Sequence, residues 1–241
     1  MSTTSAYLSV SGIDVDVVYK DIKNLHIGVY PPMGRVRVAA PLRMDDDQVR
    51  LALVQRLQWI KRQRDQLQGA TRQSLREMVT GESHHVWGDR YRLRVVERPG
   101  RAHVEVDGGR LLLYVRPDAG TEARRELLDG WYREQLRRAI PGVIGGWAPR
   151  LGVHVHRWSV RRMRTKWGSC NRESGHIWLN PELAKKHPEG LEYIVLHEMT
   201  HLLERGHGER FTRLMTGFMP DWRARSDRLN DAPLAYEKWP T

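Results

Sequence analysis

Three histidines and a glutamate stand within the eleven residues HEMTHLLERGH, at positions 197–207. His197 and His201 are four positions apart, so on a helix their imidazoles lie on one face and can reach the same ion. Glu198 directly follows the first histidine and points toward the open coordination position of such a site without binding the ion. It can therefore serve as general base toward a metal-activated water. Imidazole ligands with one exchangeable water are typical of catalytic zinc, Zn²⁺.

A catalytic zinc site needs a third protein ligand. Gly206 breaks the helix and lets the backbone turn back, and His207 follows it six positions after His201. We therefore predict that His207 is the third ligand. Two other residues could take this place: Glu204, close to the same helix face, and His176, on an upstream strand.

The elements that must position these groups are predicted from apolar spacing. Pro188 suits the first turn of a helix that continues to about Arg205 without an internal glycine or proline. A strand (VHVHRWSVRRM), a loop (RTKWGSCNRESG) and a second strand (HIWLN) precede it, and another helix begins near Glu209. Phe211 on that helix is expected to pack beneath the site. The strand GHIWLN is predicted to be the sheet edge that pairs with an extended peptide.

The loop before that strand contains further candidates. Arg164 and Lys166 are predicted to face a substrate, and Asn180 is a candidate for orienting a metal ligand through a hydrogen bond. Trp167 fits a tight turn with the following glycine under the metal, or simply packs the loop against the helix. Cys170 is predicted to be a packing residue, with a role as fourth ligand in a resting state as the alternative.

The upstream sequence is organised as a β-rich lobe with one long helix at about 1–120, followed by an α+β domain at 121–241. Period-2 alternation in the first 42 residues predicts a small antiparallel sheet. Apolar positions 49, 53, 57, 60 and 67 predict the long helix. A second β-rich stretch follows, in which His84 and His85 are expected in an exposed loop, and then a helix from Thr121 to about Ala148. The sequence shows no internal repeat.

The amino-acid composition indicates what class of protein this is. The chain has 241 residues, of which 40% are hydrophobic and 29% charged, as in globular proteins. A single cysteine excludes an intramolecular disulfide and a four-cysteine zinc site. The amino terminus lacks the basic and apolar regions of a secretory signal, and no apolar stretch approaches the roughly 20 residues that cross a bilayer. We therefore expect a cytoplasmic protein without a membrane partner.

The charge points to a polyanionic partner. There are 40 Lys and Arg residues against 29 Asp and Glu residues, a formal net charge of +11. Such an excess favours nucleic acid, nucleotide or acidic peptide as a partner bound through a basic surface. The alternative interpretation is a solvated basic surface without a partner.

Two motifs resemble a known family. HEMTHLLERGHGERF is similar to the zincin core of the YgjP-like and SprT-like metal-dependent hydrolases, and RTKWGSCNRESGHIWLN resembles a segment typical of the YgjP-like group. The resemblance extends over nearly the whole chain. It implies a zincin-like α+β catalytic domain with an H-E-x-x-H helix, zinc bound by His197, His201 and His207, and Glu198 as general base. SprT-like relatives include proteases that act on DNA-bound proteins.

Three functions are consistent with these features. The first is a zinc-dependent metallopeptidase that acts on a protein or peptide, including nucleic-acid-associated proteins. The second is a metal-dependent hydrolase of a non-peptide substrate such as a nucleoside triphosphate, although the sequence has no G-x-x-x-x-G-K-[ST] loop. The third is a non-catalytic zinc-containing protein that binds nucleic acid. Glu198 favours the first two, because a structural zinc site has no use for a base.

Overall fold

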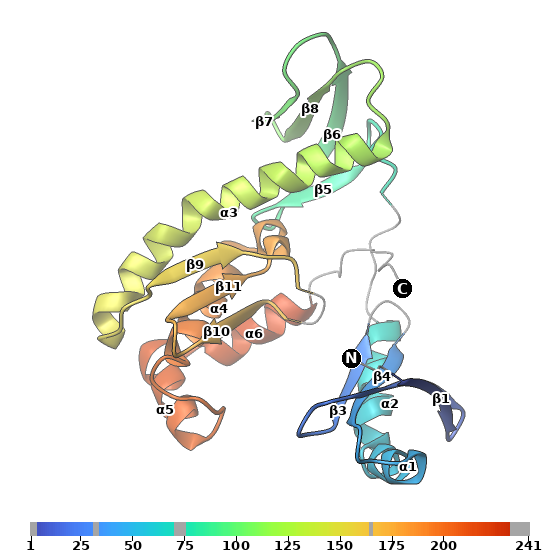
Figure 1. The fold of residues 1–241 in the computed structure, drawn as a ribbon. Coiled ribbons are helices and arrows are strands. Elements are labelled where there is room, and N and C mark those ends of the chain that lie inside the picture. Colours follow the sequence, from blue (N-terminus) through green and yellow to red (C-terminus); the bar gives the residue numbers. More distant parts are fainter. Residues whose placement is uncertain (1–3, 31–33, 70–75, 164–165, 232–241) are drawn as a thin grey trace. The chain divides into compact units, whose positions relative to one another are not determined.

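The computed structural model describes residues 4–30, 34–69, 76–163 and 166–231 (Figure 1). The chain forms two compact units, one within Met1–Arg72 and the other within Gln73–Ala235, and each has its own buried core. The fold class is α+β, as the sequence predicts. Within the described ranges, no helix is long and apolar enough to cross a membrane.

The first unit is a four-stranded sheet with two helices. Its strands, in the spatial order β1-β2-β4-β3, are β1 (Thr4–Val10), β2 (Ile13–Lys20), β3 (His26–Tyr30) and β4 (Arg35–Pro41). The sequence predicts an antiparallel sheet, but this sheet is mixed. The two antiparallel hairpins β1-β2 and β3-β4 join through a parallel β2-β4 pair. The single predicted helix is divided into α1 (Asp46–Gln55) and α2 (Leu57–Gly69), since the backbone leaves helical geometry at Arg56.

The second unit begins with the same topology. Its first sheet, in the order β5-β6-β8-β7, contains β5 (Ser83–Val86), β6 (Asp89–Glu97), β7 (His103–Asp107) and β8 (Arg110–Val115). Here too two antiparallel hairpins join through a parallel pair, β6-β8. The sequence shows no repeat, yet a ββββ arrangement followed by helix occurs twice. Helix α3 (Thr121–Leu151) follows and runs beside this sheet (Figure 1).

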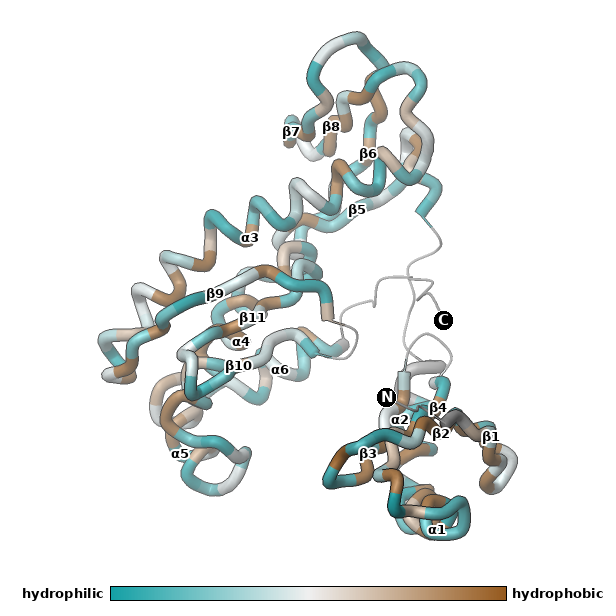
Figure 2. The backbone as a smooth tube through the Cα atoms, viewed as in Figure 1, coloured by the Kyte–Doolittle hydropathy of each residue, from teal (hydrophilic) through white to brown (hydrophobic). Residues whose placement is uncertain are grey.

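The boundary predicted at residue 120 is not where the structure divides. Strand residues Leu93, Leu111 and Leu113 are buried in one core with side chains of α3 and of the later helices. The sheet β5–β8 therefore belongs to the second unit. Hydrophobic and hydrophilic positions alternate along α3 and the strands, which is the pattern of one-sided burial (Figure 2). His84 is buried on β5 beside Glu82, and not exposed in a loop as predicted.

The last third of the chain builds a small sheet and three helices. The sheet, in the order β10-β11-β9, contains β9 (Arg157–Val160), β10 (Gly168–Asn171) and β11 (His176–Leu179). The helical elements are a 3-10 turn (Pro181–Lys185), α4 (Pro188–Thr200), α5 (Glu209–Phe218) and α6 (Trp222–Asp231).

Two expectations about this region are wrong. Residues predicted as loop form β10, because a turn containing Gly175 in the left-handed region (φ 58°) reverses the chain into a β10-β11 hairpin. As a result β11, predicted to be the edge, is central, and β10 is the edge strand that contacts α4.

Candidate metal centre

Helix α4 carries the first histidine and the glutamate. Pro188 stands in its first turn, and the helix is buried on most sides. Its buried side chains are those of Leu191, Tyr193, Ile194, Val195, Leu196, Glu198, Met199 and Thr200. The helix ends at Thr200 and not near Arg205 as predicted. His201 is its C-cap and keeps helical backbone angles (φ −65°, ψ −18°), so the face shared with His197 is preserved.

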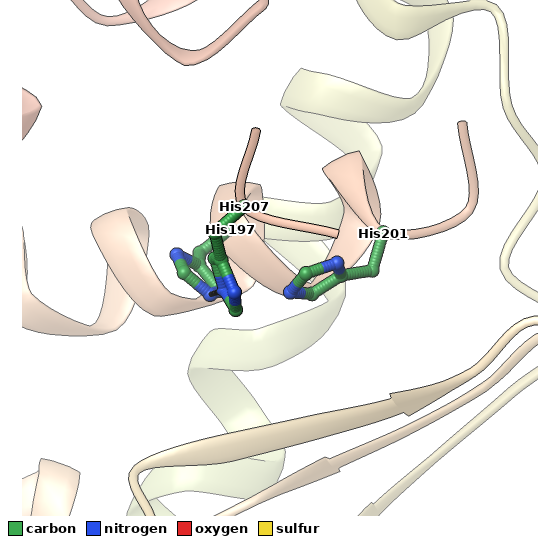
Figure 3. A group of neighbouring side chains, drawn as sticks. All are labelled: His197, His201 and His207. Carbon is green, nitrogen blue, oxygen red and sulfur yellow. Dashed lines mark hydrogen bonds between the residues drawn. The ribbon is translucent and has the colours of Figure 1, made fainter. Parts of the chain in front are cut away.

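The structure brings His197, His201 and His207 together; we call them the histidine triad. One ring nitrogen from each lies within 4.8 Å of the others. The Nε2 atoms of His197 and His207 are 3.1 Å apart, and Figure 3 shows the three rings converging. Phe211 packs beneath them, with its ring centroid 4.8–5.0 Å from each imidazole centroid. The first turn of α5 therefore supports the triad from below.

The spacing of one donor pair matches a single tetrahedral ion. Two nitrogens each at about 2.0–2.1 Å from zinc in tetrahedral geometry are about 3.4 Å apart. The 3.1 Å between the Nε2 atoms of His197 and His207 is within a few tenths of an ångström of that value. The Nδ1 atom of His201 hydrogen-bonds with the backbone oxygen of Glu204 at 3.0 Å, which leaves its Nε2 for the centre. Such an outer hydrogen bond fixes the orientation of a ligand ring.

Burial also favours the neutral form of the His197 and His201 rings. It lowers the pKa of His197 to about 3, and the neighbouring His201 and His207 lower it further. Burial likewise lowers the pKa of His201. Neutral imidazole is the form that binds metal. The Nδ1 atom of His197 is buried without a hydrogen-bond partner. Within the described chain, the polar contact of this ring is therefore the one that its Nε2 atom makes with His207.

Glu198 lines the same cleft as the triad and is 5% exposed. Burial raises the pKa of its carboxyl to about 8, and the positive charge of Lys166 opposes that rise. Among the described residues no hydrogen bond or ion pair engages the carboxylate. A general base works best when its pKa lies near the working pH, and the raised pKa of this carboxyl brings it into that range.

Gly168, the first residue of β10, has no side chain and so leaves space for the Glu198 carboxylate. A Cβ atom at residue 168 would lie 2.6 Å from Glu198 Oε1 and 2.8 Å from Ile194 Cγ2. The sequence predicts a turn under the metal at Gly168, whereas in the structure this glycine contacts the carboxylate. The glycine itself is visible in the WGSC motif. The spacing of residues in the sequence does not show which side chain packs against it.

We expect Gly168→Ala to impair hydrolysis without removing the metal. The new methyl group displaces the Glu198 side chain, and misplacement of a reacting group by about 1 Å can cost about 100-fold in rate. The measurement is kcat/KM together with zinc content. Gly217→Ala is the matched control, because a Cβ there meets nothing within 4 Å. Equal activity of the two variants would contradict the role given to Gly168.

The two rival third ligands are placed elsewhere. The Glu204 carboxylate lies 3.7 Å from Arg210, in an ion pair, while only its backbone oxygen contacts the triad. The Nε2 atom of His176 is 2.9 Å from Ser159 Oγ, and its ring stacks on Trp178. Neither belongs to the group of ring nitrogens that could hold an ion.

Asn180 does not orient a metal ligand as expected, whereas Cys170 packs against the core as the sequence predicts. Asn180 donates hydrogen bonds to the backbone oxygens of Met163 and Lys166 at 2.8 and 2.9 Å, so it fixes the loop before β10 and not a histidine ring. Burial raises the pKa of the Cys170 thiol to about 11, and Glu198 raises it further. A raised thiol pKa makes Cys170 a poor nucleophile, and its sulfur is outside the group of atoms that could hold an ion.

A cleft of about 1100 Å³ contains the triad and Glu198. It is lined by α4, by the whole of β10 and by three basic residues: Lys166, Arg172 and Arg205. Lys166 lies here, where the sequence predicts that it faces a substrate; Arg164, predicted with it, lies outside the described residues. Sequence reasoning missed Arg172 and Arg205, because no pattern separates two cleft arginines from the many others.

Comparison with known proteins identifies one family. The family model described as "YgjP-like, metallopeptidase domain" matches residues 23–232. Among solved structures, the metallopeptidase zymogen abylysin of Pyrococcus abyssi matches with 21% identity and a TM-score of 0.35, over 37% of this chain and 90% of that one. No curated protein matches.

Proposed function

This chain belongs to the YgjP-like metallopeptidase family, and we propose that it is a zinc-dependent peptidase of zincin-like architecture whose ion is held by the histidine triad. The family supports a metal-dependent peptidase in general. The observation that carries the finer proposal is the convergence of three imidazole nitrogens within 4.8 Å in the same cleft as a buried carboxylate.

Each residue has a distinct role in this mechanism. Zinc, when bound, would polarise the scissile carbonyl and acidify a water molecule. Glu198 accepts a proton from the attacking water and delivers it to the leaving amine. The Glu204 backbone oxygen keeps the His201 ring in place, while Phe211 supports all three rings. Gly168 leaves room for the carboxylate to reach the water.

We propose that a substrate binds in extended form along β10. This strand is at the edge of its sheet and lines the cleft, so one side of its backbone has no strand partner among the described residues. Such an edge binds an extended peptide through main-chain hydrogen bonds. This mode places a substrate carbonyl near the triad whatever its side chains are.

The basic residues of the cleft favour acidic side chains in the substrate. Lys166, Arg172 and Arg205 are exposed, and within the described residues none of them forms a side-chain hydrogen bond or ion pair. The acidic residues that line the cleft are Glu173 and Glu198. The cleft thus carries a net positive charge, and a polypeptide with acidic residues near the scissile bond complements it.

We expect peptides with glutamate beside the scissile bond to be cleaved with a higher kcat/KM than matched peptides with glutamine. Exposed charge pairs contribute about 0.2–1 kcal/mol each, so one pair should give a preference of roughly 1.4- to fivefold that weakens with salt. Changing Lys166, Arg172 and Arg205 to glutamine should remove it, with zinc content unchanged. An unaltered preference in this variant would show that the cleft cations do not select the substrate.

The peptidase proposal is tested with the zinc-loaded full chain and an unstructured protein in ¹⁸O-labelled water. We expect peptide fragments whose new carboxyl ends contain ¹⁸O, and loss of cleavage when a chelator removes the metal. A parallel reaction with nucleoside triphosphates should release no phosphate. Phosphate release with an intact protein substrate would overturn the proposal.

A further inference from the structure

The outward face of the sheet β5–β8 concentrates positive charge. Leu93 on β6 points into the core, so Arg90, Arg92 and Arg94 project from the opposite face. Arg110 on β8 lies beside Arg92 in the parallel register and projects the same way. All four arginines are exposed. They therefore form a continuous group on the side of the sheet that faces away from the core.

Two carboxylates share this face, Glu105 and Asp107 of β7, and Asp107 lies opposite Arg110 in the antiparallel register, but within the described residues neither forms an ion pair with these arginines. Arg90 donates a hydrogen bond to Ser83 Oγ (2.8 Å) and Arg92 donates one to the Gly81 backbone oxygen (3.3 Å). Within the described part of the chain, none of the four arginines forms an ion pair. Arginines that are ion-paired elsewhere in this unit include Arg116, Arg124, Arg125, Arg137, Arg138, Arg213, Arg225 and Arg228. The four arginines of this face thus outnumber its two carboxylates, and none of the four is ion-paired.

Aromatic rings lie beside the arginines. Tyr114 on β8 projects to the same face as Arg110, and the His103 ring stacks on it with centroids 4.4 Å apart. The Arg98 guanidinium lies 4.0 Å from the centroid of the Tyr114 ring. Two acids, Glu105 and Asp107, are confined to the edge strand β7, where Glu105 contacts His103 at 3.1 Å. Flat groups and positive charge therefore share one surface.

The fold itself does not require this charge. The first sheet has the same topology, and its strands β2 and β4 correspond to β6 and β8. There the outward positions include Asp14 and Asp16 together with Arg35 and Arg37, and Arg35 pairs with Asp16. The equivalent face in the first unit is thus nearly balanced, whereas that of the second carries a net positive charge.

We propose that the face formed by Arg90, Arg92, Arg94, Arg98 and Arg110, which we call the basic sheet face, binds single-stranded nucleic acid. Guanidinium groups bind phosphates, and a base stacks on the outer side of the group formed by His103, Tyr114 and Arg98, in which His103 and Arg98 cover the Tyr114 ring. A single strand is favoured because its bases are free to stack on a sheet surface, while those of a duplex are not. This site lies outside the cleft, and binding at it does not depend on the proposed peptidase activity.

The test is fluorescence anisotropy of a labelled 20-nucleotide single strand, as DNA and as RNA, with the full-length protein at several salt concentrations. We expect the variant with Arg90, Arg92 and Arg94 changed to glutamine to bind at least tenfold more weakly. The slope of log K against log salt should fall by about 2, since three phosphate contacts contribute about 0.7 each. Tyr114→Leu should weaken binding about fivefold or more without changing the slope, because stacking involves no ions.

Two matched control variants test whether the position and the charge of these arginines matter for binding. Changing Arg137, Arg138 and Arg213 to glutamine removes the same charge from exposed, ion-paired positions and should leave binding within about twofold. Changing Arg90, Arg92 and Arg94 to lysine keeps the charge and should preserve most of the binding. Equal weakening by the two glutamine variants, absence of binding by the unaltered protein at low salt, or binding to phosphatidylserine vesicles but not to oligonucleotides would each overturn the proposal.

Discussion

Glu198→Gln is expected to abolish peptide hydrolysis while the protein still binds zinc and stays folded. Glutamine has the same shape as glutamate, so it fits the space beside Gly168, but its amide cannot accept the proton of the attacking water. Positioned general bases contribute about 10²- to 10⁴-fold to rate, and we expect a loss in that range. The measurement is kcat/KM on an unstructured protein substrate, with zinc content determined on the same sample.

A second, conservative variant distinguishes loss of the carboxylate from disturbed packing around residue 198. Glu198→Asp keeps a carboxylate but shortens its reach, and should retain more activity than the glutamine variant. Glu173→Gln removes the other acidic residue of the cleft and should have little effect on the zinc-supported rate. Full activity in Glu198→Gln would show that the proton acceptor is another group.

His207→Ala is expected to weaken zinc binding by more than about 100-fold. Loss of an outer hydrogen-bond partner alone costs about 10- to 100-fold in metal affinity, so loss of a ligand should cost more. His207 is exposed and lies after the helix, so its removal leaves the core intact and the effect reports on the ion. The measurement is zinc competition with a chromogenic chelator, with activity followed in parallel.

The rival ligands supply the controls. His176→Ala and Glu204→Gln each remove a candidate ligand that the structure places outside the group of converging ring nitrogens. Both should retain zinc affinity within about threefold. If Glu204→Gln loses zinc while His207→Ala retains it, the third ligand has been assigned incorrectly.

Local spacing predicts the parts of the structure that depend on one stretch of sequence. The helix from Thr121 and the new helix at Glu209 are present, because apolar periodicity and helix-starting residues act within a few turns. The YgjP-like family is also identified from two motifs, and the family model confirms it. The position of His207 beside His197 follows from the glycine break, which the sequence displays directly.

Features that depend on distant partners are not predictable in this way. The Gly168–Asn171 segment is short and lacks apolar alternation, so it reads as loop, and it is the strand β10 only because β11 supplies its hydrogen bonds. The unit boundary is misplaced for a similar reason. The strands β5–β8 resemble the N-terminal strands in pattern, and only the shared core with α3 assigns them to the second unit. The contact between Gly168 and Glu198 joins residues 30 positions apart.

The most direct test of the proposed centre is an anomalous difference map at the zinc absorption edge, from crystals of the zinc-loaded Glu198→Gln protein. We expect one strong peak at about 2.0–2.1 Å from the Nε2 atoms of His197, His201 and His207, with a solvent molecule as fourth ligand. A peak held by Cys170, His176 or the Glu204 carboxylate, or one that leaves the cleft empty, would contradict the proposed centre.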